Sequence, residues 1–512
     1  MTPGTVYLVG AGPGDDGLIA LRGAELVAAA DVVLYDRLIA HELLSAMRPD
    51  AEAIPVGKTA GDHSVPQDAI NQLLVDHAKQ GKLVVRLKGG DPYLFGRGGE
   101  EALFCAEHGV PFCVIPAITS AFAVPAAAGI PVTHRGVSTH VTVITASAGP
   151  TGSDEPDYAW LAQSTGTVVL LMGLRRAGAI AERFIEAGAP PSRPMAVISR
   201  GCTAEQQTIT GTLADMPATI AAAQLPSPGI IVIGDVVRLR EHLNWFENRP
   251  LFGRTVAVTR ARAQASDLAA LLQEAGARVE ECPTIRIDNT QPPVDVARTA
   301  LQALGTTAPS RVLLFTSVNG ARQFFAGLQE LGWDARHLAG TQVGVVGTAT
   351  AAACRAAGIE PDIIPDTHTS PGLLQAVRDR ALTPGTAVLI RAQEGSDELL
   401  EGLDKDGWDT TLVVAYRTVV EPLSEEAVRR VQHSDLITFT AASTVRNLAA
   451  TAPDSRTVPA VSIGPRTTAA AQEAGYTVIA QAQTPTVEAL AQAVVQAVAH
   501  PAGELVATQG LA

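Results

Sequence analysis

One arginine in the first half of the chain has surroundings that suggest ligand binding. Arg97 stands between Gly96 on one side and Gly98 and Gly99 on the other, so no bulky neighbour gives its side chain a packing role. A guanidinium group in such a place suits a carboxylate-bearing substrate, because its planar N–H groups match the two oxygens of a carboxylate. Arg97 is therefore a candidate binding residue for an acidic molecule.

A glycine-rich turn follows the first predicted strand, with the sequence GAGPGD at residues 10–15. A dinucleotide fingerprint needs glycine at the sixth position, where this chain has Asp15, and Pro13 stiffens the turn. The sequence also has no GxxxxGK(S/T) segment that would hold a nucleotide triphosphate. NAD is therefore not expected, and the turn taken alone is compatible with a purely structural role.

Four turns in the second half place hydroxyl residues where a predicted strand runs into a helix. LLFTSVNG at 313–320 is echoed by LITFTAASTV at 436–445, and VVGTAT at 345–350 is echoed by SIGPRT at 462–467. Two similar lobes are implied. Free backbone N–H groups and the helix dipole favour an anion at such turns, but Ser and Thr are also ordinary N-caps. Both interpretations stay open for any single turn.

Short β-branched runs alternate with Ala- and Leu-rich helical stretches along the whole chain, which predicts α/β layers. The predicted strands of the first half are residues 6–9, 32–35, 83–87, 141–145, 168–171, 195–198 and 230–233. Those of the second half are residues 255–259, 312–315, 343–346, 387–390, 436–440 and 460–463. A polar stretch at 242–254 separates the two series, and we place the main boundary near residue 248.

Composition narrows the possible functions. The 512 residues include 38 basic and 52 acidic side chains, a net charge of −14. This length predicts three or four folding units, and the acidic balance argues against nucleic-acid and membrane-surface binding. No apolar run approaches the roughly 18 residues of a membrane span, so a cytoplasmic protein is expected. The five cysteines are widely spaced and predict reduced core or near-core residues, with no metal site.

Longer motifs follow one another in the first half. They are GAGPGD at 10–15, ADVVLYDRL at 30–38, VVRLKGGDPYLFGRGGEE at 84–101, PAITSA at 116–121, GIPVTHR at 129–135, LMG at 171–173 and SRGCTAEQ at 199–206. In this order they resemble the S-adenosylmethionine-dependent uroporphyrinogen-III C-methyltransferases of the tetrapyrrole methylase family. Ala117 stands where that family usually has glycine, and Asp16 where a proline is common.

This resemblance implies a methylase domain at residues 1–245 with lobes of about 1–135 and 136–245, usually a homodimer, that binds S-adenosyl-L-methionine between its lobes. The implied cofactor contacts are Pro13, Gly89, Gly90, Asp91, Leu94, Thr119, Ser120, Met172 and Gly201. Asp36 is implied as the acceptor of a substrate proton and Lys58 as a proton donor or substrate-binding cation, with Arg97 and Glu100 near the tetrapyrrole. Without the family, Asp36 reads as a solvated strand-end residue.

The second half carries shorter motifs, GRTVAVTR at 253–260, LFTSVNG at 314–320, GVVGTAT at 344–350 and LVVAYRT at 412–418. They resemble uroporphyrinogen-III synthase, which cyclises hydroxymethylbilane with loss of water and without a cofactor. After a linker at 246–252, the resemblance implies a domain at 253–512, with one lobe of about 253–288 plus 420–512 and a second of about 289–419. The implied substrate contacts are Arg260, Thr316, Ser317, Thr348, Ser443, Thr444 and Thr467. Tyr416 either donates a proton to the leaving hydroxide or is a core-edge residue.

Together, the two resemblances predict a bifunctional enzyme. Its second half would make uroporphyrinogen III from hydroxymethylbilane, and its first half would add two methyl groups from S-adenosyl-L-methionine, giving precorrin-2 on the way to sirohaem or cobalamin. Two alternatives stay open: a non-catalytic, tetrapyrrole-sensing or scaffolding second half, and a methylase that acts on another corrin intermediate. The long motif at 87–101 argues against the latter.

Overall fold

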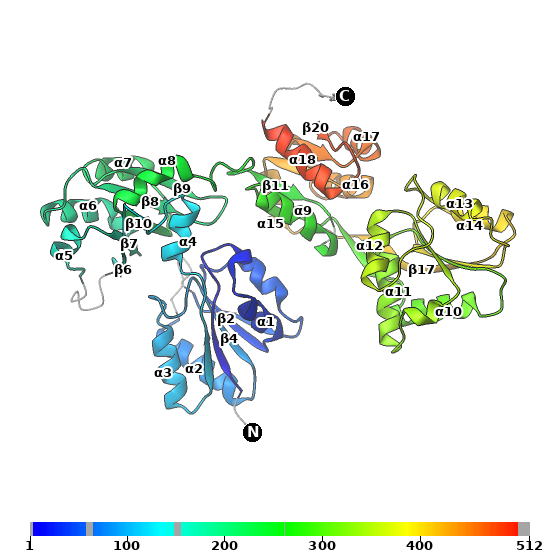
Figure 1. The fold of residues 1–512 in the computed structure, drawn as a ribbon, viewed down its shortest axis with the longest axis horizontal. Coiled ribbons are helices and arrows are strands. Elements are labelled where there is room, and N and C mark those ends of the chain that lie inside the picture. Colours follow the sequence, from blue (N-terminus) through cyan, green and yellow to red (C-terminus); the bar gives the residue numbers. More distant parts are fainter. Residues whose placement is uncertain (1–3, 58–64, 148–154, 261, 500–512) are drawn as a thin grey trace. The chain divides into compact units, whose positions relative to one another are not determined.

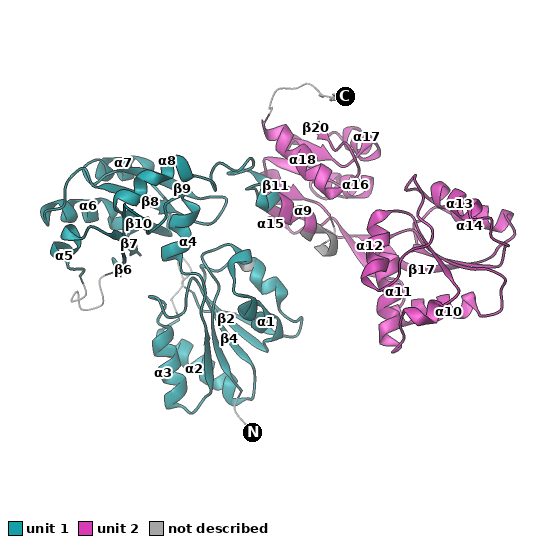
Figure 2. Ribbon diagram, in the orientation of Figure 1, with its two compact units in different colours: residues 1–255, 272–278 teal, residues 256–271, 279–512 magenta. Residues whose placement is uncertain are grey.

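The computed structural model describes residues 4–57, 65–147, 155–260 and 262–499 (Figure 1). The chain divides into two compact units, residues 1–255 with 272–278 and residues 256–271 with 279–512 (Figure 2). Each unit packs helices against five-stranded sheets, which confirms the α/β class expected from the alternating pattern. Among the described residues, no helix has both the length and the apolar character needed to cross a bilayer.

The first sheet is parallel throughout, in the order β3-β2-β4-β1-β5. Helices cover both of its faces, so its inner strands are apolar on both sides, as a parallel sheet requires. Because all strands run the same way, the turns that follow β1, β2 and β4 meet at one edge. The elements are β1 (Val6–Gly10), η1 (Asp16–Leu18), α1 (Leu21–Ala29), β2 (Val32–Tyr35), η2 (His41–Ala46), β3 (Glu52–Pro55), α2 (Gln67–Lys79), β4 (Val84–Lys88), α3 (Gly98–Glu107) and β5 (Phe112–Ile115).

The second sheet of the first unit is mixed, in the order β6-β7-β10-β8-β9. Strand β10 runs antiparallel to both neighbours, and its Ile230 pairs with Leu171 of β7 and with Ile198 of β8. The ends of β7 and β8 therefore lie at the same edge. The elements are α4 (Ser120–Ala127), β6 (Val141–Thr145), α5 (Tyr158–Gln163), β7 (Thr167–Leu171), η3 (Leu174–Arg176), α6 (Ala177–Glu186), β8 (Pro194–Ser199), β9 (Gln207–Thr212), α7 (Met216–Ala223), β10 (Gly229–Ile233), η4 (Asp235–Leu239) and α8 (Arg240–Leu243).

The second unit contains two sheets, in the orders β12-β11-β18-β19-β20 and β13-β17-β16-β14-β15. The first of these joins residues near 255–281 to residues 436–481, and the second is built from the chain between them. In each sheet, two adjacent parallel strands, β14 and β15 or β18 and β19, lead directly into helices. These are the four echoing segments of the sequence, so the expected pair of similar lobes is confirmed.

The elements of the second unit alternate regularly. They are β11 (Thr255–Val258), α9 (Arg262–Glu274), β12 (Arg278–Glu281), β13 (Ile285–Asn289), α10 (Pro293–Leu304), β14 (Arg311–Phe315), α11 (Val318–Glu330), η5 (Ala335–Leu338), β15 (Gln342–Val345), α12 (Thr348–Ala356), α13 (Ser370–Asp379), β16 (Thr386–Ala392), α14 (Glu398–Lys405), β17 (Asp409–Val420), α15 (Glu425–Gln432), β18 (Leu436–Phe439), α16 (Ala442–Thr451), η6 (Pro453–Thr457), β19 (Ala460–Ser462), α17 (Pro465–Glu473), β20 (Val478–Gln481) and α18 (Val487–Ala499).

The five cysteines are unpaired, and their placement corrects one expectation. Cys105, Cys202, Cys282 and Cys354 are buried, as predicted, but Cys113 is exposed because it lies on the edge strand β5. Burial raises the pKa of the Cys105 and Cys282 thiols to about 11, and that of the Cys202 and Cys354 thiols to about 12. Since the thiolate is the reactive form, the four buried thiols are protected twice, by enclosure and by protonation.

We therefore expect a thiol reagent such as 5,5′-dithiobis(2-nitrobenzoate) to modify about one cysteine quickly in the native protein near pH 8. Cys113→Ser should remove this fast phase, while Cys202→Ser should leave it unchanged. Unfolding in urea should release the remaining thiols. A fast phase that persists in Cys113→Ser would contradict the burial of the other four.

Candidate functional site

Two loops at the carboxyl edge of the first sheet are held together by their backbones. The loop after β1 and the loop after β4 exchange hydrogen bonds, from Gly12 N to Gly90 O (3.3 Å) and from Gly90 N to Gly12 O (2.7 Å). A Cβ atom on Gly10 would lie 2.6 Å from Gly90 O and closer still to the Cβ of Ala117. Only glycine allows this approach, which brings the segments 10–15, 89–94 and 116–121 together.

Asp91 fixes the same arrangement through its carboxylate. Its Oδ1 accepts a hydrogen bond from Tyr93 N (2.9 Å), and its Oδ2 accepts one from Ala117 N (3.0 Å). Both oxygens thus have backbone partners, and each keeps a further lone pair for a ligand. The residue predicted from the family as a cofactor contact also ties the loop after β4 to the loop before α4.

Helix α4 connects these loops to the second sheet. Thr119 caps it by accepting a hydrogen bond from Ala121 N (3.2 Å), and Ser120 is its first residue. Leu94 packs against the apolar cluster that joins Val124 of α4 to Leu171 at the end of β7.

The loop after β8 lies against the same helix. A Cβ atom on Gly201 would lie 2.6 Å from Cγ2 of Val124, and one on Gly14 would lie 3.5 Å from Cγ2 of Thr203. The predicted cofactor contacts therefore come together from both sheets, and we name the residues 10–15, 89–97, 116–120, 172–173 and 200–203 the strand-end loops.

Strained backbone is concentrated in the strand-end loops. Seven non-glycine residues among those described have a positive φ, and five lie here: Phe95 (53°), Arg97 (60°), Met172 (59°), Arg200 (47°) and Cys202 (64°). A left-handed conformation costs such residues on the order of 1–3 kcal/mol and is found most often at functional sites. The positive φ of Phe95, Arg200 and Cys202 was not predictable from the sequence, because these side chains do not favour that conformation.

A buried group of charges lies beside these loops. Arg86 Nη2 contacts Asp36 Oδ1 (2.6 Å), Arg86 Nε contacts Glu101 Oε1 (3.0 Å), and Lys88 Nζ contacts the same Glu101 oxygen (3.0 Å). Burial lowers the pKa of Lys88, and the positive charge of Arg86 lowers it further. Only Asp36 of these four was singled out from the sequence. The missed signal is the presence of charges at 86 and 88 inside a strand that is otherwise apolar.

The other predicted catalytic residues of the first half are placed differently. Arg97 and Glu100 are both exposed and form a bidentate ion pair (2.9 and 2.7 Å), through which Arg97 holds the pKa of Glu100 below its usual range. This pair lies at the start of α3, beside Gly98. Lys58 lies outside the described residues.

In the second unit, the hydroxyl turns divide into two kinds. Ser317 is an N-cap that accepts a hydrogen bond from Gly320 N (3.2 Å), as the plain interpretation predicts. Gly347, Ala441 and Gly464, the residues before helices α12, α16 and α17, supply no capping side chain. The first N–H groups of α12 and α16 therefore keep the capacity to bind an anion, whereas α17 begins with Pro465, which has no N–H.

The side chains predicted to bind substrate in these turns are unevenly exposed. Thr348 is exposed, while Thr316 and Ser443 are half-buried. Thr444 is fully buried and donates to Ala441 O (2.8 Å), and Thr467 is 6% exposed. In this conformation neither Thr444 nor Thr467 presents its side chain to solvent.

Tyr416 and Arg260 are also largely enclosed. Tyr416 is 7% exposed and belongs to the apolar cluster of its lobe, which agrees with the core-edge alternative. The register of β16 and β17 shifts next to it, because Arg391 pairs with Val414 and Ala392 with Tyr416. Such bulges re-aim a side chain and are frequent near active sites. Arg260 is half-buried after β11, and burial lowers its pKa.

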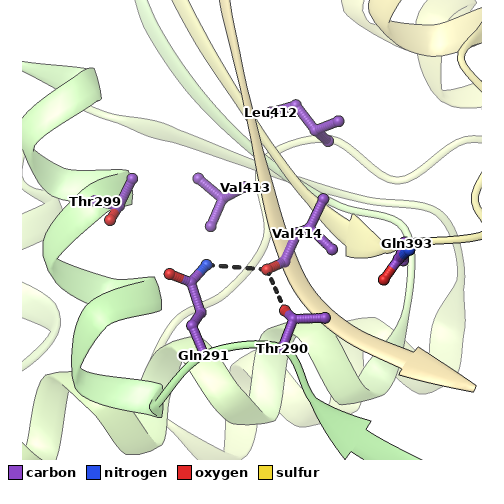
Figure 3. A pocket seen from close by; sticks show the side chains of 7 residues that line it. All are labelled: Thr290, Gln291, Thr299, Gln393, Leu412, Val413 and Val414. Carbon is purple, nitrogen blue, oxygen red and sulfur yellow. Dashed lines mark hydrogen bonds between the residues drawn. The ribbon is translucent and has the colours of Figure 1, made fainter.

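A cavity of about 460 Å³ lies on the same lobe. Figure 3 shows Thr290 Oγ1 and Gln291 Nε2 both donating to the carbonyl of Val414, at 2.7 and 2.9 Å. The remaining lining residues are Thr299, Gln393, Leu412 and Val413. None of the residues predicted to bind substrate or to act in catalysis lines this cavity.

Comparison with known proteins assigns each half to a family model. Residues 5–217 match the model of tetrapyrrole (corrin/porphyrin) methylases, and residues 266–492 match that of uroporphyrinogen-III synthase HemD. The porphyrin biosynthesis protein HemD of Ruminiclostridium josui is 36% identical over 478 residues, which cover 92% of this chain and 94% of that protein.

Other relatives match the first half alone. Siroheme synthase 2 of Aeromonas hydrophila subsp. hydrophila is 51% identical over 243 residues, 48% of this chain, and the match spans 51% of that protein. A solved uroporphyrin-III C-methyl transferase of Thermus thermophilus, complexed with S-adenyl homocysteine, is 37% identical and covers 46% of this chain and 94% of its own, with a TM-score of 0.39.

The contact between α4 and the loop after β8 can be tested by enlarging the residue on one side of it and shortening the residue on the other. Gly201→Ala should lower the free energy of unfolding by about 1–3 kcal/mol, because its methyl group overlaps Val124. Adding Val124→Ala should recover part of that loss, so the double variant should be more stable than the sum of the single effects predicts. The measurement is urea unfolding of the full chain, and strictly additive effects would contradict the contact.

Proposed function

Since the chain belongs to the family of porphyrin biosynthesis proteins in which a tetrapyrrole methylase is fused to a uroporphyrinogen-III synthase, we propose that its two halves catalyse consecutive reactions. The second half cyclises hydroxymethylbilane to uroporphyrinogen III, and the first half transfers two methyl groups to that product, giving precorrin-2. Residues 1–245 are assigned to the methylase, 246–252 to a linker and 253–512 to the synthase. The match along nearly the whole length of one relative carries this proposal.

The strand-end loops fit S-adenosyl-L-methionine as the cofactor of the first half. Glycine at 10 and 201 is required by close packing, because a Cβ atom there would overlap Ala117 or Val124, and this packing brings loops of both sheets together around the proposed cofactor contacts. Met172 holds a 56% exposed thioether side chain at the end of β7, a soft surface for an adenine ring. Pro13, Gly89, Gly90, Asp91, Leu94, Thr119 and Ser120 complete the proposed contacts. When bound, this cofactor supplies an electrophilic methyl group.

Two of the side chains proposed to act on the tetrapyrrole, Asp36 and Arg97, lie in the loops after β2 and β4, at the carboxyl edge of the first sheet. Asp36 accepts the proton that the macrocycle loses when its carbon becomes methylated. Lys58 is proposed as a donor or substrate-binding cation. Arg97, exposed beside Glu100, is placed to exchange that partner for a substrate carboxylate. A homodimer formed through this half is part of the proposal.

In the second half, the proposed task is to hold a flexible octa-acid so that one ring closure is faster than the spontaneous one. The uncapped N-termini of α12 and α16 are proposed to supply backbone donors for its carboxylates. Tyr416, which follows the bulge between β16 and β17, is proposed to donate a proton to the departing hydroxide. Arg260, Thr316, Ser317, Thr348 and Ser443 are proposed as further substrate contacts.

The proposal is tested by anaerobic incubation of the full chain with hydroxymethylbilane, with and without S-adenosyl-L-methionine. We expect the type III isomer in both cases, and two added methyl groups by mass when the cofactor is present. Spontaneous closure without enzyme gives the reference for the type I isomer. Type I product alone would mean that the second half is a binding or sensing module, and unmethylated product would overturn the methylase assignment.

Cofactor binding is tested separately at Gly10. Gly10→Ala should weaken binding of S-adenosylhomocysteine by about tenfold or more, because overpacking on the order of 1–3 kcal/mol falls on the loop pair that the cofactor needs. Isothermal titration calorimetry on the full chain measures this. Gly99→Ala is the matched control, since a Cβ atom there meets nothing within 4 Å. Equal affinities in the two variants would contradict the proposed location.

A further inference from the structure

Asp36, Arg86, Lys88 and Glu101 form a charge group, and packing alone does not explain why it is buried. Arg86, Lys88 and Glu101 have side chains that are 3%, 3% and 0% exposed, whereas Asp36 is 31% exposed. With two acids and two bases the group is neutral overall. Asp36 is the one member of the four that reaches solvent to a substantial degree.

Glu101, in the first turn of α3, binds the other buried members of the group. Its Oε1 accepts hydrogen bonds from Arg86 Nε (3.0 Å), from Lys88 Nζ (3.0 Å) and from Gln67 Nε2 at the start of α2 (3.2 Å). Its Oε2 is buried and has no hydrogen-bond partner among the described residues. Burying charges in this way stabilises a fold little or not at all compared with apolar residues of similar size. An unsatisfied buried oxygen adds a further cost.

Arg86 connects Glu101 to Asp36 by using separate N–H groups of one rigid plane. Nε is directed to Glu101, Nη2 to Asp36 (2.6 Å), and Nη1 to the carbonyl of Leu87 (3.3 Å). Because these three acceptors are fixed, the guanidinium plane of Arg86 is held in one orientation. The position of the Asp36 carboxylate, at the end of β2, is therefore determined from inside the lobe.

We propose that Arg86 is a positioning residue for Asp36, and that Glu101 and Lys88 serve to hold Arg86 in place. The inference rests on the proposed function, in which Asp36 accepts a proton from the methylated macrocycle. It explains why the lobe buries a costly charge group beneath its strand-end loops, since a base is effective only when its oxygen is held within hydrogen-bond reach of the proton. Arg86 itself need not touch the substrate.

The test replaces Arg86, which contacts both Glu101 and Asp36, by lysine, whose charge sits on a single nitrogen. In the full chain, Arg86→Lys keeps the charge but cannot contact both carboxylates in the same geometry. We expect kcat for methyl transfer to uroporphyrinogen III to fall on the order of 100-fold, as for an ångström-scale misplacement. KM for S-adenosyl-L-methionine should stay within about threefold, because none of the four charged side chains is among the proposed cofactor contacts.

Arg48→Lys is the matched control. Arg48 also pairs with an aspartate of the same strand region, contacting Asp31 at 2.9 Å, but Asp31 precedes β2 whereas Asp36 follows it. This variant should keep wild-type kcat. Glu101→Gln is a near-isosteric second variant that retains acceptor oxygen for Arg86, and it should lower kcat less than Arg86→Lys while preserving the fold.

A double-variant cycle with Asp36→Asn separates positioning from general stability. If Arg86 acts through Asp36, then Arg86→Lys should lower kcat no further in the Asp36→Asn background. Full multiplicative loss in that background, or wild-type kcat in Arg86→Lys alone, would overturn the positioning role. Wild-type kcat in Asp36→Asn would instead overturn the proposed function of Asp36, so the two failures give different results.

Discussion

The two hydrogen bonds exchanged between Gly12 and Gly90 are the constraint on which the arrangement of the first unit depends. They join the loops that follow two adjacent parallel strands, β1 and β4, at the edge where those strands end. The exclusion of any Cβ atom at Gly10 keeps this approach close enough for Ala117 to lie against the same turn. Asp91 then attaches Ala117, in the loop before α4, to the pair. A local backbone contact thus helps to hold the loop that leads into α4, the helix that packs against the second sheet.

The same region holds most of the strained non-glycine backbone of the described residues. Five of the seven non-glycine residues with a positive φ lie in the strand-end loops, Gly10 and Gly201 exclude a Cβ atom there, and Oε2 of Glu101, which has no partner in the described part of the chain, lies just beneath them. Around them the strands are apolar and fully enclosed, as at Val84, Val85 and Leu87 of β4. Strained backbone within a well-packed fold is characteristic of functional sites, because the residues elsewhere in a protein usually favour the local structure that they adopt.

Most strands were predictable from the sequence, and most of the omissions have a common physical reason. The thirteen predicted strands all correspond to strands of the structure, including the inner pairs β1 with β4 and β14 with β16. Six of the seven strands missed in the described part of the chain, β3, β5, β9, β12, β13 and β20, are sheet edges, and the seventh, β17, is an inner strand. An edge strand such as β9 has no buried residue, so it lacks the apolar run that marks a buried parallel strand.

The site was predictable to the extent that single residues carry a chemical signature. Arg97 stands out because its charge lies between glycines, where packing does not need it, whereas Asp36 was indicated only by the family resemblance. Arg86 and Lys88 went unremarked because the surrounding β-branched residues identify β4 as core, and their partner Glu101 lies 13 residues beyond Lys88 in sequence. The ion pairs between Glu101 of α3 and the two charged residues of β4 depend on the fold, so the sequence alone does not predict them.

The two halves differ in how strongly their chemistry constrains the sequence. In the first unit, the loops need glycine at particular points and tolerate few alternatives, which makes the motif at 84–101 long and recognisable. In the second unit, α12 and α16 begin at Thr348 and Ala442 without a capping side chain, and their backbone N–H groups would be left equally free by many side chains. Main-chain donors leave a weak trace in sequence, because they do not depend on the identity of the side chain. Short and diffuse motifs are therefore what the proposed binding of substrate at these helix starts predicts.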